Sequence, residues 1–361
     1  MAYKMLMLVA CIAISGCARL TETHSSNTRS DATKDGPVDG AADGAADGAA
    51  DGPADGAADG PADGPVGDGG PVADGPVGDG GPVGDTRGLD MPLPNDTQAP
   101  GVWVTIPRGT FTMGSPLSEP CRLANEDQHQ VTLTHEFEMQ TTEVTQTQFL
   151  ALMGYNPSFS SSCGGTCPVE NVTWDEAVAY TNALSAREEL VECYTCTGSG
   201  DTVSCEEAAT FSGQQIYSCP GYRLPTDAEW ERAYRGGTQT AYYTGANDED
   251  SCSTACPSFS QADETGWYCG NSGEKLHPVG EKSPNAFGLF DMGGNIEERC
   301  HDRYTASLGS SAVIDPAGSD GTFHVLRGGA FALLAHSMCA AHRTQQGYRR
   351  SYIGFRCART R

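Results

Sequence analysis

The chain has 361 residues, of which 47 are acidic and 22 basic, for a formal net charge of −25. This balance excludes nucleic acid as a partner, because neutralising phosphates requires a basic surface that the chain does not supply. Fifteen cysteines are too many for a reducing compartment, so the composition predicts an exported protein with disulfide bonds.

The N-terminus has the features of an export signal. Lys4 supplies a positive charge, and residues 5–14 form an apolar run that is too short to span a bilayer. Residues 14–17, Ile-Ser-Gly-Cys, resemble the lipobox of bacterial lipoproteins, whose cysteine is acylated. We therefore expect a signal peptide at residues 1–16 and a lipid anchor on Cys17, which would hold the protein at the outer membrane or periplasmic face of the bacterial cell envelope. An ordinary secretory signal with an incidental cysteine is the alternative.

A low-complexity segment follows. Between Asp35 and Asp85 the chain repeats Asp-Gly-Pro/Ala-Val/Ala at a period of four and contains no aromatic residue. Such a composition cannot bury enough apolar surface to fold, and proline and like charges keep the chain extended. We expect residues 17–100 to be a disordered tether that joins the membrane to a globular domain over residues 101–361.

Short strands are predicted at the start of the globular part. Residues 102–107 alternate like a half-buried strand, and residues 109–114 read as its hairpin partner. Residues 131–133 and 137–139 are further short strands. Order is therefore expected to begin near Gly101.

Three helices are predicted from capping boxes, in which a threonine is followed three residues later by Glu or Gln. Their expected ranges are 145–152, 173–190 and 226–235. In the second helix an apolar face is formed by Trp174, Ala177, Val178, Thr181 and Leu184. With few helices and many short strands between glycine turns, the predicted fold class is α+β with much irregular structure.

Four cysteines lie between the second and third helices: Cys193, Cys196, Cys205 and Cys219. They could form a zinc site or disulfides. Their spacing matches no common zinc ribbon and the compartment is oxidising, so disulfides are favoured. Each disulfide contributes about 2–4 kcal/mol to stability, and reduction should therefore loosen residues 160–270.

A set of short motifs runs through the globular part in a fixed order: Phe111-Thr112-Met113-Gly114-Ser115, Glu143-Val144-Thr145, residues 168–174, residues 221–233, Gly288-Leu289-Phe290-Asp291-Met292, Gly294-Asn295, Arg327-Gly328-Gly329 and Gly354-Phe355-Arg356. Together they make residues 101–361 similar to the formylglycine-generating enzyme, or sulfatase-modifying factor, family. The resemblance implies the single-domain fold of that family, a variant of the C-type lectin fold.

The resemblance also implies a chemistry that this sequence does not support. Active members convert a cysteine of a target sulfatase to formylglycine, using copper(I) held by two thiolates in Gly-Gly-Ser-Tyr-x-Cys-x4-Cys, and soft sulfur ligands suit copper(I). The serine position here is Ala330, and the two cysteine positions are Leu333 and Met338. We therefore expect no copper and a binding or accessory domain for a protein or glycan ligand.

An oxidase with altered ligands is the alternative function. Cys339 lies one residue after the second cysteine position, and Cys300 could be its partner in a new metal pair. The simpler expectation is that Cys339 forms a disulfide with Cys300 or Cys357. His301, His336 and His342 are a further metal candidate, although solvated or core histidines are far commoner.

A second departure falls at residues 294–299, Gly-Asn-Ile-Glu-Glu-Arg, where the family usually has Gly-Asn-x-Trp-Glu-Trp. The resemblance implies a structural calcium ion bound by the carboxylates of Asp291 and Glu298 and by the carbonyls of Gly294 and Ile296. Hard oxygen ligands suit calcium. The alternative is that Glu298 forms an ion pair, with Arg299 or Arg303 as its partner.

Overall fold

The computed structural model describes residues 101–361, and the expected signal peptide, Cys17 and tether lie outside the described residues. The helices are α1 (Gln146–Met153), α2 (Trp174–Arg187), α3 (Asp227–Arg235) and α4 (Ser260–Thr265). The strands are β1 (Trp103–Ile106), β2 (Gly109–Met113), β3 (His129–Leu133), β4 (Phe137–Gln140), β5 (Tyr194–Thr197), β6 (Ser204–Glu207), β7 (Tyr222–Arg223), β8 (Glu297–Arg303), β9 (Val313–Ile314), β10 (His324–Arg327), β11 (Thr344–Gln345), β12 (Ile353–Gly354) and β13 (Ala358–Thr360). Few helices and short strands confirm the predicted α+β class.

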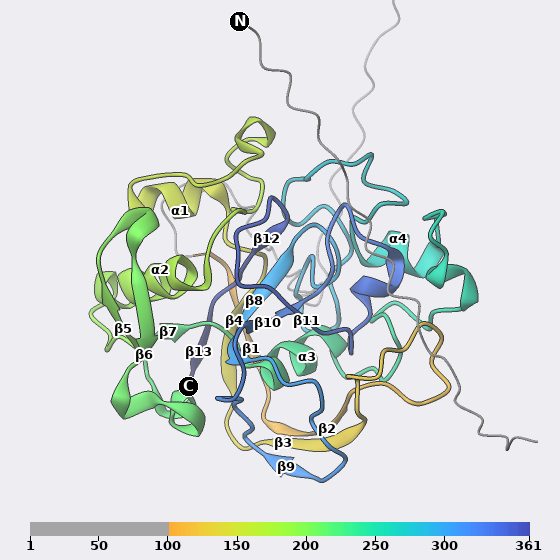
Figure 1. Ribbon diagram of the computed structural model, residues 1–361, viewed down its shortest axis with the longest axis horizontal. Helices are drawn as coiled ribbons and strands as arrows, with labels where there is room; N and C mark the ends of the chain where they lie inside the picture. The colour runs from red at the N-terminus through yellow and green to blue at the C-terminus, as the bar shows by residue number, and fades with distance from the viewer. Residues whose placement is uncertain (1–100) are drawn as a thin grey trace, which may run out of the picture. The chain divides into compact units, whose positions relative to one another are not determined.

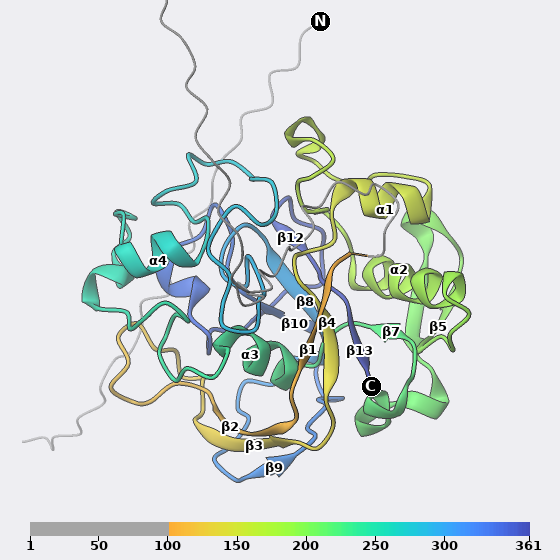
Figure 2. The same ribbon diagram turned by 180° about the vertical axis from the view of Figure 1, so that it is seen from behind.

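The strands form small sheets that connect distant parts of the chain. The strand orders are β1-β4-β13-β7, β11-β10-β8-β12, β2-β3-β9 and β5-β6. The C-terminal strand β13 inserts between β4 and β7, and Ala358 pairs with Met139. Figures 1 and 2 show α1 and α2 at one end of the domain and α4 at the other. None of the described helices is both long and apolar enough to cross a membrane.

The predicted hairpin between the first two strands is wrong. β1 pairs with β4, while β2 pairs with β3 in another sheet. Pro107 separates β1 from β2 and cannot donate to a ladder, and Arg232 of α3 binds its carbonyl with Nε at 2.8 Å. The predicted strands at 131–133 and 137–139 are confirmed within β3 and β4.

The capping boxes of α1, α2 and α3 are all present. α2 ends at Arg187, three residues before the predicted end, because the chain turns at Glu189, whose φ is 57°. The Leu190 N–H then donates to the Ser185 carbonyl, as in a Schellman-type helix end. The predicted apolar face of α2 is confirmed, since Trp174, Ala177, Val178, Thr181 and Leu184 are all buried.

Disulfides hold the loops around this core. The predicted disulfides among the four central cysteines are confirmed as Cys193–Cys219 and Cys196–Cys205. Three more pairs are Cys121–Cys252, Cys163–Cys167 and Cys256–Cys269. Since all four central cysteines are oxidised, they cannot form the alternative zinc site.

Candidate functional site

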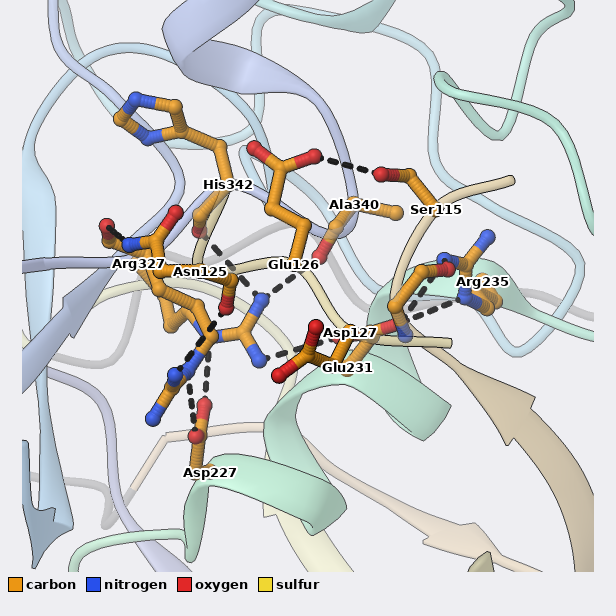
Figure 3. A network of polar contacts seen from close by, with 12 residues as sticks. Ser115, Asn125, Glu126, Asp127, Asp227, Glu231, Arg235, Arg327, Ala340 and His342 are labelled. Carbon is orange, nitrogen blue, oxygen red and sulfur yellow. Dashed lines mark hydrogen bonds and ion pairs between the residues drawn. The ribbon is translucent and has the colours of Figure 1, made fainter. Parts of the chain in front are cut away.

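The segment after Gly329, where the family places its metal ligands, is held against α3 by one buried arginine. Arg327 is fully buried, and its Nη1 donates to the carbonyls of Ala340 at 2.7 Å and His342 at 3.3 Å. Its Nε donates to Asp227 at 2.5 Å and its Nη2 to Glu231 at 3.0 Å (Figure 3). The Arg327 side chain therefore links the first two turns of α3 to the backbone of residues 340–342.

Each carboxylate of this network also contacts a second arginine. Arg343 binds Asp227 at 2.8 Å. Arg235 binds Glu231 at 2.7 Å, as Figure 3 shows. Burial alone would raise the pKa of Asp227, but the charges of Arg327 and Arg343 outweigh it and hold that pKa below its usual value. Each carboxylate of the network is thus paired with two arginines, which suits a rigid scaffold.

Apolar side chains occupy the three positions that carry the family's chemistry. Ala330 and Met338 are completely buried, and Leu333 is half-buried. Met338 packs in a cluster with Tyr242 and Tyr268, and its sulfur lies against Gly294, where an added Cβ would come within 2.9 Å of it. The thioether therefore fills space in a core and does not face an opening.

The predicted disulfide of Cys339 is wrong. Cys300, Cys339 and Cys357 are all free and buried. Cys339 packs with Met338 and Tyr242, whereas Cys300 and Cys357 lie in the main core, so the fold places Cys339 in a different cluster from either partner. Burial raises the pKa of all three thiols, which disfavours the thiolate that metal binding and nucleophilic chemistry require.

Two of the predicted calcium residues, Asp291 and Glu298, contact Arg356, an arginine that the sequence did not link to them. Its guanidinium binds both oxygens of Glu298, at 2.6 to 2.9 Å, and the backbone carbonyl of Asp291 at 3.2 Å. Trp230 of α3 donates its Nε1–H to Glu298 at 2.8 Å. The predicted ion pair of Glu298 with Arg299 or Arg303 is therefore wrong, and its partner is Arg356, 58 residues away.

Two other carboxyl groups in this region have free oxygens. Asp291 accepts from the Gly280 N–H through Oδ2, while its Oδ1 is buried without a described partner. Both carboxylate oxygens of Glu143 are also buried without a described hydrogen-bond partner. Burial, reinforced by the Asp291 charge, raises the pKa of Glu143 well above its usual value, and burial raises the pKa of Asp291 to about 6.

These orphaned oxygens, one from the predicted ligand Asp291 and two from Glu143, which was not predicted, suit a hard cation. Glu298 does not fit the same role as well, because Arg356 and Trp230 already satisfy its carboxylate. Within residues 101–361 there is no group of three or more His, Cys, Asp or Glu side chains suited to a metal. Sequence reasoning missed Glu143, although it lies in the motif Glu143-Val144-Thr145.

The three candidate histidines do not converge. The ring centroids of His336 and His342 lie 6.0 Å apart. His301 instead contacts Tyr194, with 3.1 Å between Nδ1 and the phenol oxygen. Burial lowers the pKa of His301 and of His342 to about 3, so both are neutral core residues at physiological pH.

Comparison with known proteins agrees with this architecture. Residues 90–361 match the family described as "Sulfatase-modifying factor enzyme 1-like domain". Chaperone protein LppX of Paenibacillus barcinonensis is 32% identical over 209 residues, which cover 52% of this chain and 66% of LppX. The formylglycine-generating enzyme of Thermomonospora curvata is 31% identical over 209 residues, which cover 53% of this chain and 55% of that enzyme.

Among solved structures, Treponema denticola variable protein 1 is 31% identical with a TM-score of 0.61, and the match covers 72% of this chain and 95% of that protein. The two curated relatives named above are each matched over less than two thirds of their length, at 66% and 55%. The family match, in contrast, extends over the whole described part of the chain. The chain therefore belongs to the sulfatase-modifying factor enzyme 1-like family.

Proposed function

We propose that this protein is a membrane-tethered binding or accessory module that keeps the sulfatase-modifying factor fold without its copper chemistry. One observation carries the proposal: Ala330, Leu333 and Met338 occupy the positions of the serine and the two thiolates. None of these side chains can bind copper(I) as a thiolate. The nearest remaining thiol, Cys339, is buried with a raised pKa and is in a different cluster from Cys300.

Two further observations support the accessory and tethered parts of the proposal. The relative LppX is named a chaperone protein, and that name supports an accessory role for this chain. Cys17 follows Ile-Ser-Gly, the pattern expected of an acylated lipoprotein cysteine. The partner would be a protein or a glycan recognised by surface loops, since the functional residues of a rigid scaffold lie most often on loops.

Calcium is the metal that the residues present can hold. Its ligands would be the orphaned carboxylate oxygens of Asp291 and Glu143, with the carbonyls of Gly294 and Ile296, while Glu298 stays bound to Arg356. The ion would neutralise two buried carboxylates and would have a structural role. Among residues 101–361, the free thiols Cys300 and Cys339 lie in different clusters and do not offer copper(I) a paired donor set.

A direct assay separates the accessory module from an oxidase with altered ligands. The full chain is incubated with copper(I), oxygen and a Cys-x-Pro-x-Arg peptide. Mass spectrometry of the peptide then shows whether its cysteine thiol has been converted to an aldehyde. We expect no conversion and no stoichiometric copper. Aldehyde formation that is lost in the Cys339→Ala variant would overturn the proposal in favour of the oxidase.

A matched double variant makes a negative result informative. Leu333→Cys with Met338→Cys restores both thiols on the same scaffold. We expect this variant to bind copper(I) where the parent chain does not, because the only change is the supply of soft ligands. Acylation is tested separately by mass spectrometry of the mature N-terminus, with Cys17→Ser as the unmodified control.

A further inference from the structure

A cavity lies between the N-terminus of α2, strand β8 and the loop before β12. Its volume is about 220 Å³, and its lining includes Trp174, Asp175, Arg299, Arg303, His324 and Gln346. Two arginines face the same small space. None of the positions that carry the family's chemistry, and none of the predicted calcium residues, lines it.

Arg299 is a buried cation without an ion-pair partner among the described residues. Its side chain is 1% exposed, and its hydrogen bonds all go to backbone carbonyls, those of Val172, Gln346 and Tyr348, each at 3.1 Å. Burial lowers the pKa of Arg299 to about 10, so the guanidinium is still charged at neutral pH. The three carbonyls take one hydrogen bond each from Nε, Nη1 and Nη2, which leaves one N–H on each Nη atom for another acceptor. They also leave the net charge uncompensated, which is costly in a protein interior.

The carboxylates nearest to Arg299 act from beyond ion-pair distance. Glu297, Glu176 and Asp175 attract its charge, and Arg349 repels it. The Glu297 carboxylate accepts a hydrogen bond from the Thr344 hydroxyl at 2.8 Å, and Glu176 forms an ion pair with Arg349 at 2.8 Å. Glu297 and Glu176 are therefore engaged with other partners.

Arg303 adds a second, half-buried cation at the mouth of the cavity. Its described hydrogen bonds both come from Nη1, to the carbonyls of Gly321 and Thr322 at 3.5 and 3.3 Å, which leaves Nε and Nη2 for a ligand. The lining acid Asp175 accepts from the Cys205 N–H at 2.7 Å. His324 stacks on Trp174 at 3.9 Å, and burial lowers its pKa to about 3, so the ring adds no charge.

We propose that this cavity binds a small oxyanion, such as a carboxylate, sulfate or phosphate group, between the guanidinium groups of Arg299 and Arg303. Planar guanidinium groups bind oxyanions through paired, charge-assisted hydrogen bonds. The N-terminus of α2 favours negative charge at the same place. The site is independent of the proposed function, because an oxidase and an accessory module would both have it.

The test is a calorimetric titration of the full chain with sodium sulfate, phosphate and acetate at low ionic strength. We expect saturable binding of at least one anion, weakened about tenfold or more by Arg303→Gln, since a charge-assisted hydrogen bond is worth about 1.5–3 kcal/mol. Preference for sulfate or phosphate would identify a tetrahedral dianion as the ligand, and preference for acetate a carboxylate.

The control variant is Arg108→Gln, which removes the same charge from an exposed position that does not line the cavity. It should bind within about twofold of the parent chain, because distant surface charges are screened. Arg299→Lys keeps the charge without the planar fork and should weaken binding in a variant whose circular dichroism shows it is folded. Equal losses in Arg108→Gln and Arg303→Gln, or no saturable binding of any of the three anions, would overturn the proposal.

Discussion

Replacing Arg327 with methionine should be strongly destabilising. Arg327 is fully buried and contacts Asp227 at 2.5 Å and Glu231 at 3.0 Å, while two carbonyls of the segment after Gly329 accept from the same guanidinium. Removing one partner of a buried ion pair leaves uncompensated charge and costs about 3–5 kcal/mol. Because Arg343 and Arg235 still pair with the two acids, we expect the lower half of that range, measured as the free energy of unfolding in urea.

The pH dependence gives the same prediction a second readout. Arg327 lowers the pKa of Asp227. The stabilisation by the Arg327–Asp227 pair is therefore fully present above the unfolded pKa of Asp227 and is lost as the pH falls through its folded pKa. The deficit of Arg327→Met should therefore be largest near neutral pH and shrink in acid. Arg187→Met is the control, because its pair with Glu188 is 38% and 40% exposed and should contribute about 1 kcal/mol or less. If the two variants unfold within about 1 kcal/mol of each other at pH 7, the network does not stabilise the domain.

Three further predictions concern sulfur, calcium and a buried acid. Dithiothreitol should lower the melting temperature and expose residues 160–270 to hydrogen exchange. The Cys193–Cys219 disulfide closes a loop of 26 residues, and that closure stabilises the fold by about 3 kcal/mol. An unchanged melting curve would contradict this. A chelator should lower the melting temperature of the parent chain but not that of the Asp291→Asn variant, because the variant lacks the carboxylate proposed to bind calcium. Equal shifts in both would place calcium elsewhere. Burial raises the folded pKa of Glu297 to about 7, so ionisation of this acid opposes folding. The Glu297→Gln variant should therefore gain about 2–3 kcal/mol of stability relative to the parent chain as the pH rises from about 4.5 to 7. A difference in urea unfolding that does not change with pH would refute this.

The parts of the fold that the sequence predicted correctly are those with local signals. α3 is the clearest case: Thr226 accepts from the Glu229 N–H, Glu229 accepts from the Thr226 N–H, and Gly236 ends the helix in the left-handed conformation. All three interactions lie within a few residues along the chain. The same is true of the capping boxes at the starts of α1 and α2.

Apart from the end of α2, the errors concern pairings between residues that are distant along the chain. The partner of β1 is β4, about 30 residues away, because Pro107 separates it from the nearer strand. Arg356 was known as part of a motif, but nothing in the sequence showed that it would bind Glu298. Cys339 was expected to pair with Cys300 or Cys357, but it packs with Tyr242 and Met338 in a different cluster from either thiol. Spacing along the chain does not specify which buried surfaces meet.

Residues 294–299 depart from the family pattern, and this was visible in the sequence. What the departure does to the structure depends on how side chains alternate between the two faces of β8. Glu298 points to the side where Arg356 neutralises it, while Glu297 and Arg299, two residues apart, share the other face. A strand that replaces two tryptophans with an acid and a base would be expected to pair them. Glu297 is instead driven toward its neutral form by burial, and Arg299 keeps its charge on carbonyl dipoles alone. The face is left with an excess of positive charge beside a cavity, and an entering oxyanion is the simplest species that would balance it.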